Sequence, residues 1–408
     1  MSVAGQRTAD AATESAVRRD ERRAAGVACS AHALHDGFTD VIFVLLPVWQ
    51  REFGLGYAEV GMLRGIYAGT MATFQIPAAL LAERLGTAPV LALGTALAGT
   101  GYCLAGISTG FALLVMALFV GGLGASTQHP LAAALMARAF AGPRSLKALG
   151  TYNFAGDIGK MSVPAAAALL LTVMTWQPAV ILLGVTGLAC AAIIFFATPR
   201  YGPEPEVAKA DDVASATAAP AAVSRIAFPV LLSIGVIDSA ARMAFLTFLP
   251  FLLTAKGASL PTIGLALTLV FAGGAAGKLV CAFIGARIGT IATVWLTEGL
   301  TAVLIIVLLP LSLEAGMFLL PVIGIALNGT STVLYGGVPA LVAPERRARA
   351  FSIFYTGAIG SGAVAPALFG IVGDRLGIPT ALVVVAVVVL LTLPLALILK
   401  PALPARSA

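Results

Sequence analysis

Residues 177–198 read QPAVILLGVTGLACAAIIFFAT, a stretch that contains no charged side chain. A helix of about 20 apolar residues crosses the hydrocarbon core of a bilayer, so this stretch predicts a transmembrane helix. The rest of the chain has the same character, because 59% of its 408 residues are hydrophobic and 11% are charged. A soluble domain carries about 25% charged residues. The composition therefore excludes a soluble enzyme, a disordered chain and a nucleic-acid binder.

Apolar runs of similar length recur along the whole chain and predict an all-α membrane protein with twelve transmembrane helices. They are too long, and alternate too little, to be strands of a transmembrane β-barrel. The predicted spans cover residues 27–50, 59–82, 88–107, 110–136, 148–172, 177–198, 226–253, 259–284, 290–312, 315–342, 350–373 and 379–399.

The basic residues predict how these spans are oriented. Of the 25 lysines and arginines, eighteen fall on one side of the membrane, three on the other and four within spans. Cytoplasmic loops carry the excess of basic residues, so we expect both termini in the cytoplasm of a bacterial inner membrane. Residues 1–26 then form a cytoplasmic tail with no cleavable signal peptide, residues 400–408 form a second tail, and the net charge of +6 belongs to the cytoplasmic face.

The polar segment 199–225 divides the chain into two halves of six spans, residues 27–198 and 226–399. The halves share short motifs at an offset near 202: Asp36 corresponds to Asp238, and residues 84–86 (RLG) correspond to 287–289 (RIG). An even number of spans gives both halves the same orientation. Parallel halves related by an axis along the membrane normal are typical of secondary transporters.

Residues 79–86 read ALLAERLG and resemble the G-x-x-x-D-R-x-G motif of the major facilitator superfamily, with Ala79 and Glu83 replacing the first glycine and the aspartate. The resemblance implies a gating role for Glu83 and Arg84, and for Arg287 in the second half. A fuller copy, GIVGDRLG at 370–377, follows the eleventh span, and we expect it to be structural.

Two further segments resemble the fosmidomycin-resistance branch of that superfamily. Residues 32–37 read HALHDG, similar to the branch's H-x-x-N-D-G, and His129-Pro130 follows a glycine-rich stretch in the fourth span. The resemblance implies a proton-coupled exporter that works by alternating access. Energy then comes from a proton gradient, and no cofactor is expected.

Ionisable side chains inside the membrane cost several kcal/mol unless they are paired or hydrated, so each is a candidate for function. Asp36 and Asp40 are our first choices for a proton-carrying group. Internal ion pairs are the alternative interpretation, because Asp157 with Lys160 and Asp238 with Arg242 are spaced to pair within one helix. The proton-coupling candidates are Asp36, Asp40, Asp157, Asp238 and His129; Glu298 is expected to be structural.

Four intramembrane cations indicate an anionic substrate, because an arginine in particular binds a carboxylate or phosphonate through two parallel hydrogen bonds. These cations are Arg64, Lys160, Arg242 and Lys278, and the polar side chains expected to complete the substrate site are Tyr67, Gln75, Tyr152, Asn153, Tyr335 and Tyr355. The four cysteines are isolated in apolar stretches, and no metal-ligand spacing is present. We therefore expect no metal site.

The sequence thus predicts a monomeric transporter in the lipid bilayer, not an enzyme, that exports a small polar or anionic compound in exchange for protons. The same intramembrane charges also suit a transporter that takes up an organic anion together with protons. A membrane scaffold or sensor that transports nothing is the alternative of a different class, although a scaffold has no need for intramembrane charges.

Overall fold

The structure is a computed structural model that describes residues 3–140, 143–199, 226–343 and 346–401. These residues are helical apart from short connections, which confirms the predicted all-α fold. In chain order the helices are α1 (Val3–Phe53), α2 (Tyr57–Leu85), α3 (Thr87–Gly106), α4 (Phe111–Ala125), α5 (Gln128–Ala139), α6 (Pro143–Val173), α7 (Trp176–Ala197), α8 (Ala227–Ala255), α9 (Leu260–Ile288), α10 (Thr290–Leu308), α11 (Leu313–Leu341), α12 (Arg347–Leu376), α13 (Ile378–Leu390) and α14 (Thr392–Leu399).

These helices form twelve segments long and apolar enough to cross a membrane, as predicted. Two of the segments are broken in the middle: α4 and α5 form the fourth, and α13 and α14 form the last. A proline follows each break and cannot donate the backbone hydrogen bond to the carbonyl four residues earlier. Pro130 leaves the Ser126 carbonyl without this bond, and Pro394 does the same at Leu390.

The outside of the bundle is apolar, as expected for a protein whose solvent is lipid. Large apolar side chains such as Phe318, Val173 and Phe196 are among the most exposed in the structure. Aromatic and aliphatic side chains also fill the interior of the bundle, where Trp49 and Phe245 are fully buried. An apolar interior together with an apolar exterior identifies a multi-pass membrane protein.

Helix α1 extends well beyond the predicted first span, because it begins at Val3 and includes most of the predicted tail 1–26. Glu21 of this extension binds Arg144 of α6 through two hydrogen bonds, at 2.9 and 2.7 Å. Residues 200–225 of the predicted linker and residues 402–408 of the predicted C-terminal tail lie outside the described part of the chain.

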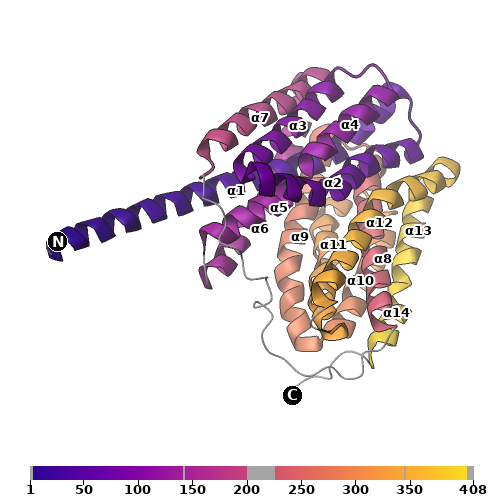
Figure 1. The fold of residues 1–408 in the computed structure, drawn as a ribbon. Helices are drawn as coiled ribbons and strands as arrows, with labels where there is room; N and C mark the ends of the chain where they lie inside the picture. Colours follow the sequence, from indigo (N-terminus) through magenta and orange to yellow (C-terminus); the bar gives the residue numbers. More distant parts are fainter. Residues whose placement is uncertain (1–2, 141–142, 200–225, 344–345, 402–408) are drawn as a thin grey trace.

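Helices α1–α7 form the first half of the molecule and α8–α14 form the second. The halves contact each other mainly through α2 with α12 and through α6 with α9. These contacts lie towards the side of the bundle that carries the connections 54–56, 174–175 and 256–259, which we call the closed side. In Figure 1 the halves diverge in the opposite direction, towards the chain ends marked N and C. We call that direction the open side.

Glycines allow the close contact between α2 and α12 on the closed side. A Cβ atom added at Gly61 would lie 2.3 Å from the backbone of Pro366, and one at Gly65 would lie 2.3 Å from the carbonyl of Ala363. Small residues let membrane helices approach to backbone contact. An anionic cap adds to this packing, because the Asp374 carboxylate of α12 accepts hydrogen bonds from the backbone N–H groups of Tyr57 and Ala58, at 2.5 and 3.0 Å.

The two halves repeat the same local structures at the offset seen in the sequence. Gly86 and Gly289 each end a helix with a positive φ, of 90° and 84°, which a residue with a side chain rarely adopts. The buried hydrogen bond from Gln128 to Thr95, at 2.6 Å, has its counterpart in the bond from Thr330 to Thr297, also at 2.6 Å.

Candidate transport site

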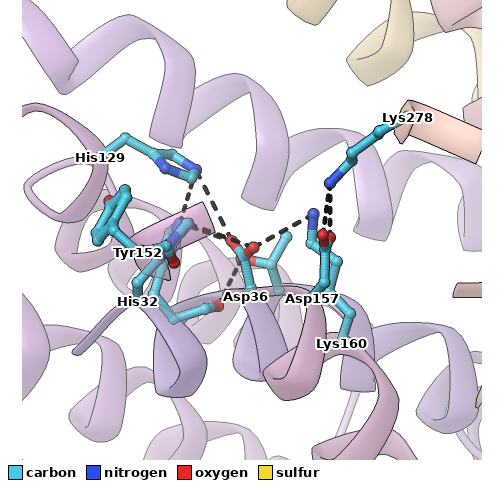
Figure 2. Close-up of polar contacts among 9 residues, drawn as sticks. His32, Asp36, His129, Tyr152, Asp157, Lys160 and Lys278 are labelled. Atoms are coloured by element: carbon cyan, nitrogen blue, oxygen red, sulfur yellow. Dashed lines mark hydrogen bonds and ion pairs between the residues drawn. The ribbon is translucent and has the colours of Figure 1, made fainter. Parts of the chain in front are cut away.

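A cluster of ionisable side chains surrounds Asp36 inside the first half. Asp36 lies one helical turn after His32 on α1, and both side chains are buried. The Asp36 carboxylate lies 3.4 Å from His32 Nε2, 3.2 Å from Lys160 Nζ of α6 and 3.9 Å from His129 Nε2 of α5 (Figure 2). Lys160 reaches Asp36 because Gly159 brings α6 against the backbone of Ala33 in α1.

The break between α4 and α5 places His129 in this cluster. His129 is the second residue of α5, and its side chain turns towards α1, where its Nε2 lies 3.2 Å from Nε2 of His35. His129 is one-third exposed, whereas His35 is buried. The cluster is therefore reachable from outside the first half through His129 and through Lys160, whose side chain is 31% exposed.

One ion pair of the site connects the two halves. Lys278 of α9 donates hydrogen bonds to both carboxylate oxygens of Asp157 of α6, at 2.6 and 2.9 Å (Figure 2). The pairing of Asp157 with Lys160 within α6, considered from their spacing, does not occur. Successive side chains of a helix point in different directions. Lys160 faces α1 and Asp157 faces α9.

Asp40 and Arg64 are buried without a salt bridge, unlike the other candidates. Their exposed fractions are 7% and 4%. Among the residues that the structure describes, no cation lies within 4.0 Å of the Asp40 carboxylate and no acid lies within 4.0 Å of the Arg64 guanidinium. Arg64 instead lies over the ring of Phe43, with Cζ 5.0 Å from its centroid, and its Nη2 lies 3.9 Å from Met243 Sδ of α8 in the second half.

In the second half, Asp238 and Arg242 pair along α8 at 3.9 Å, as their spacing predicts. Glu298 of α10 is a neighbour of Asp238 in this half. Both acids are buried, with exposed fractions of 2% for Glu298 and 4% for Asp238.

The predicted uncharged site residues are dispersed. Tyr67 is fully buried in the core of the first half, with its ring against Gly121. Tyr152 is buried, and its carbonyl binds His32. Gln75 and Tyr355 form a contact between the halves. The ring centroids of Tyr335 and Tyr355 lie 6.4 Å apart. Asn153 is exposed on α6.

The predicted gating residues Glu83, Arg84 and Arg287 are exposed at the open-side ends of α2 and α9. On the closed side, Asp374 of the fuller motif copy joins the halves directly. This contact is structural in kind, and the structural role expected of that motif stays a prediction.

The sequence predicts no metal site, and this stays a prediction, but the fold brings together three side chains of types that can bind a metal ion. Ligand atoms of His32, Asp36 and His129 all lie within 4.8 Å of one another. Sequence spacing did not reveal this cluster, because 93 residues separate Asp36 from His129. His35, which contacts His129, was missed as a site residue for the same reason.

Comparison with known proteins places this architecture in a family. The sequence profile of the Major Facilitator Superfamily matches residues 28–236 and, in a second match, residues 231–408. The chain belongs to the Major Facilitator Superfamily. The two matches divide this superfamily member close to the boundary between its two halves.

Two relatives illustrate where the chain lies within the superfamily. It is 26% identical to the fosmidomycin resistance protein of Escherichia coli (strain K12) over 178 residues, which cover 42% of each protein. It is also 26% identical to the drug efflux pump JefA of Mycobacterium tuberculosis over 193 residues, which cover 47% of this chain and 38% of the pump. The chain thus matches less than half the length of these curated relatives.

Solved structures of superfamily members share the fold along almost the entire chain. A bacterial homolog of the human lysosomal transporter Spinster, in an inward-facing and occupied conformation, aligns with a TM-score of 0.76 at 15% identity over 94% of this chain and 98% of that one. A POT family transporter in complex with 5-aminolevulinic acid aligns with a TM-score of 0.73 at 12% identity over 93% and 96%.

Proposed function

We propose that this superfamily member is a proton-coupled secondary transporter that exports a small anionic compound in exchange for protons by alternating access. The observation that carries the proposal is the pair of buried, unbridged side chains, Asp40 and Arg64. Each of the other three intramembrane cations has an acidic partner within 4.0 Å. One acid and one cation are thus left for a proton and a substrate anion.

The count of intramembrane charges supports a bound proton. Among the described residues five acids are buried, Asp36, Asp40, Asp157, Asp238 and Glu298, and they face the four cations Arg64, Lys160, Arg242 and Lys278. An uncompensated buried charge is costly in a low-dielectric interior. We infer that Glu298 and its neighbour Asp238 share one proton. Asp40 is then the acid whose charge changes most freely when solvent reaches it.

The Arg64 guanidinium supports an anionic substrate. Its Nε and Nη1 are buried without a hydrogen-bond partner among the described residues, which is costly for an ionised group. Arg64 belongs to α2 in the first half, yet its Nη2 contacts Met243 of the second half. An anion bound to Arg64 would therefore respond to movement of one half against the other.

The arrangement of the halves supports alternating access. We infer that the two six-span halves, residues 27–198 and 226–399, rock about the region between α2, α6, α9 and α12. The bias of basic residues puts the open side in the cytoplasm, so this conformation is inward-facing in a bacterial inner membrane. The Spinster homolog was solved in an inward-facing conformation. Glu83, Arg84 and Arg287 would then meet when the open side closes.

Export is proposed because two relatives are named for drug efflux or resistance. Asp40 and Arg64 suit uptake of an organic anion together with protons equally well. The direction of transport depends on the coupling stoichiometry. Transport assays from both sides of the membrane distinguish the two.

The experiment uses proteoliposomes loaded with a pH-sensitive dye, with a pH gradient imposed and fosmidomycin as the first probe, followed by simple carboxylates. Asp40→Asn is expected to abolish proton-driven flux while substrate exchange without a gradient persists. Glu52→Gln, which changes an exposed acid at the end of the same helix, is the matched control and should transport like the parent. Full driven flux in Asp40→Asn would remove Asp40 from the proton pathway, and flux without proton movement would overturn the coupling.

A further inference from the structure

The chain contains three histidines, and the fold brings all three around one carboxylate. His32 Nε2 lies 3.4 Å from Asp36 Oδ2, and the Nε2 atoms of His35 and His129 each lie 3.9 Å from Asp36 Oδ1. These two Nε2 atoms are 3.2 Å apart. We propose that three of these side chains, His32, Asp36 and His129, form a binding site for a divalent transition-metal ion of the zinc class; their ligand atoms all lie within 4.8 Å of one another.

The distances are close to those of a tetrahedral metal site. Zinc binds imidazole nitrogen and carboxylate oxygen at about 2.0–2.2 Å, so two ligand atoms of a tetrahedron lie roughly 3.3–3.6 Å apart. The Asp36 carboxylate lies 3.4 Å from His32 Nε2 and 3.9 Å from His129 Nε2, and the ligand atoms of all three residues lie within 4.8 Å of one another. Side-chain movements of roughly 1 Å would bring the three ligands to bonding distance, and a water molecule would complete the tetrahedron.

The tautomer of His32 is fixed in the form that a metal requires. His32 Nδ1 lies 2.9 Å from the carbonyl oxygen of Tyr152. A carbonyl oxygen only accepts, so Nδ1 carries the hydrogen. In the neutral ring, Nε2 then presents a lone pair to the Asp36 carboxylate, and two acceptors face each other. A cation between them removes this conflict, and a backbone carbonyl on the far ring nitrogen is typical of metal-binding histidines.

The Tyr152 ring holds His32 further in place, because the two rings stack with centroids 3.9 Å apart and planes 15° from parallel. An ion can enter past His129, which is one-third exposed, while the side chains of His32 and His35 are almost inaccessible. The site therefore has His32 and Asp36 as buried ligands and His129 as the accessible ligand at its entrance.

The fold does not need these histidines. Their equivalents in the second half, at the offset of 202, are Ile234, Ile237 and Ser331, while Asp36 corresponds to Asp238. The same helices thus pack in the second half without an imidazole group. A purely structural cluster has no reason to be confined to one of two equivalent halves.

Lys160 gives the site a built-in competitor. Its ammonium lies 3.2 Å from Asp36 Oδ2 and would repel a divalent cation bound to the same carboxylate. Metal binding and the Lys160–Asp36 ion pair are therefore antagonistic. Removal of the Lys160 charge should strengthen metal binding, an effect opposite to that of removing a ligand.

The test uses full-length protein without a polyhistidine tag, in a background lacking the four cysteines. Titration with Zn²⁺ by calorimetry and with Co²⁺ by visible absorption is expected to give one ion per chain and the intense bands of tetrahedral cobalt. His129→Gln and His32→Gln should each weaken binding at least tenfold and remove the cobalt bands. Asp238→Asn, which changes the equivalent acid of the second half, should bind like the parent.

Lys160→Met is the second arm and should tighten binding about tenfold, a gain that misfolding cannot imitate. Absence of saturable binding in both the parent and Lys160→Met would overturn the site, and so would undiminished binding in a His129→Gln protein. The result is independent of the proposed transport activity, because proton-driven flux measured in the presence of a chelator reports on Asp40 and Arg64 alone.

Discussion

Lys278 of the second half donates hydrogen bonds to both carboxylate oxygens of Asp157 in the first half, at 2.6 and 2.9 Å. This conformation is thus held by an ion pair in addition to helix packing. When the halves separate between α6 and α9, Asp157 and Lys278 must part and be hydrated again. The strength of this pair therefore contributes to the equilibrium between the two conformations.

Replacement of Lys278 by Met should shift this equilibrium towards opening of the closed side. Because the Lys278 side chain is 43% exposed, we expect a loss of about 1–2 kcal/mol rather than the value of a fully buried pair. This corresponds to roughly a 5–30-fold change in population. Distances between spin labels at Thr109→Cys and Glu314→Cys, both exposed on the closed side, measure the shift.

Lys256→Met is the matched control for this substitution. Lys256 donates hydrogen bonds to the carbonyls of Leu309 and Leu311 in its own half, so its loss should leave the distance distribution unchanged. The charge exchange Asp157→Lys with Lys278→Asp should restore the parent distribution. An unchanged distribution in Lys278→Met would mean that the pair has no part in closure.

Asp374→Ala should weaken the same side independently. The substitution removes the carboxylate that accepts hydrogen bonds from the first N–H groups of α2 across the boundary between the halves. Hydrogen bonds to a charged acceptor contribute about 1.5–3 kcal/mol. Because the Asp374 contact is exposed, we expect its contribution to lie near the lower value. The distances between the spin labels at positions 109 and 314 should lengthen. Glu59→Ala removes a helix cap within one half, so it should lower the melting temperature without changing these distances.

Gly61→Ala should prevent full closure of the closed side. The added methyl group would lie 2.3 Å from the Pro366 backbone, and overpacking of this kind typically costs about 1–3 kcal/mol. We expect longer label distances and slower transport. Gly69→Ala on the same helix is the control, since its methyl group would meet Ala363 at an ordinary 3.7 Å. Equal behaviour of the two variants would contradict this account of the interface.

Glu298→Gln should retain both stability and driven transport within about twofold. The amide can donate a hydrogen bond to the neighbouring Asp238 carboxylate, so a proton shared between the two acids would be replaced by an equivalent donor. Glu298→Leu leaves Asp238 with one fewer partner and should lower the free energy of unfolding by about 1–3 kcal/mol. Loss of proton coupling in Glu298→Gln would instead assign this pair to the transport pathway.

The fold could be predicted because its signals are local. Apolar length predicts each span, and the bias of basic residues fixes their number. The break at Ser126 was missed, because the apolar residues on both sides of 126–129 (STQH) predict one continuous span. The presence of Pro130 after a glycine-rich stretch was the available signal. The helical state of residues 3–26 was also not predicted, because polar residues give no amphipathic pattern there.

The site could be predicted only in part. Hydropathy identifies the charges inside the membrane, but the rotation of each helix decides their partners. The spacing of Asp157 and Lys160 permits a pair within α6, yet these two side chains bind Lys278 and Asp36 instead. The histidine cluster depends on contact between α1 and α5. No pattern within either segment predicts that contact.

The ion pairs within each half have an electrical consequence. Moving one elementary charge across a membrane at 100 mV involves about 2.3 kcal/mol. Lys160 and Asp36 travel together with the first half, and Arg242 and Asp238 with the second, so these two pairs carry no net charge through the field. The membrane voltage should therefore act on the ions being carried and on Asp157 and Lys278, which belong to different halves.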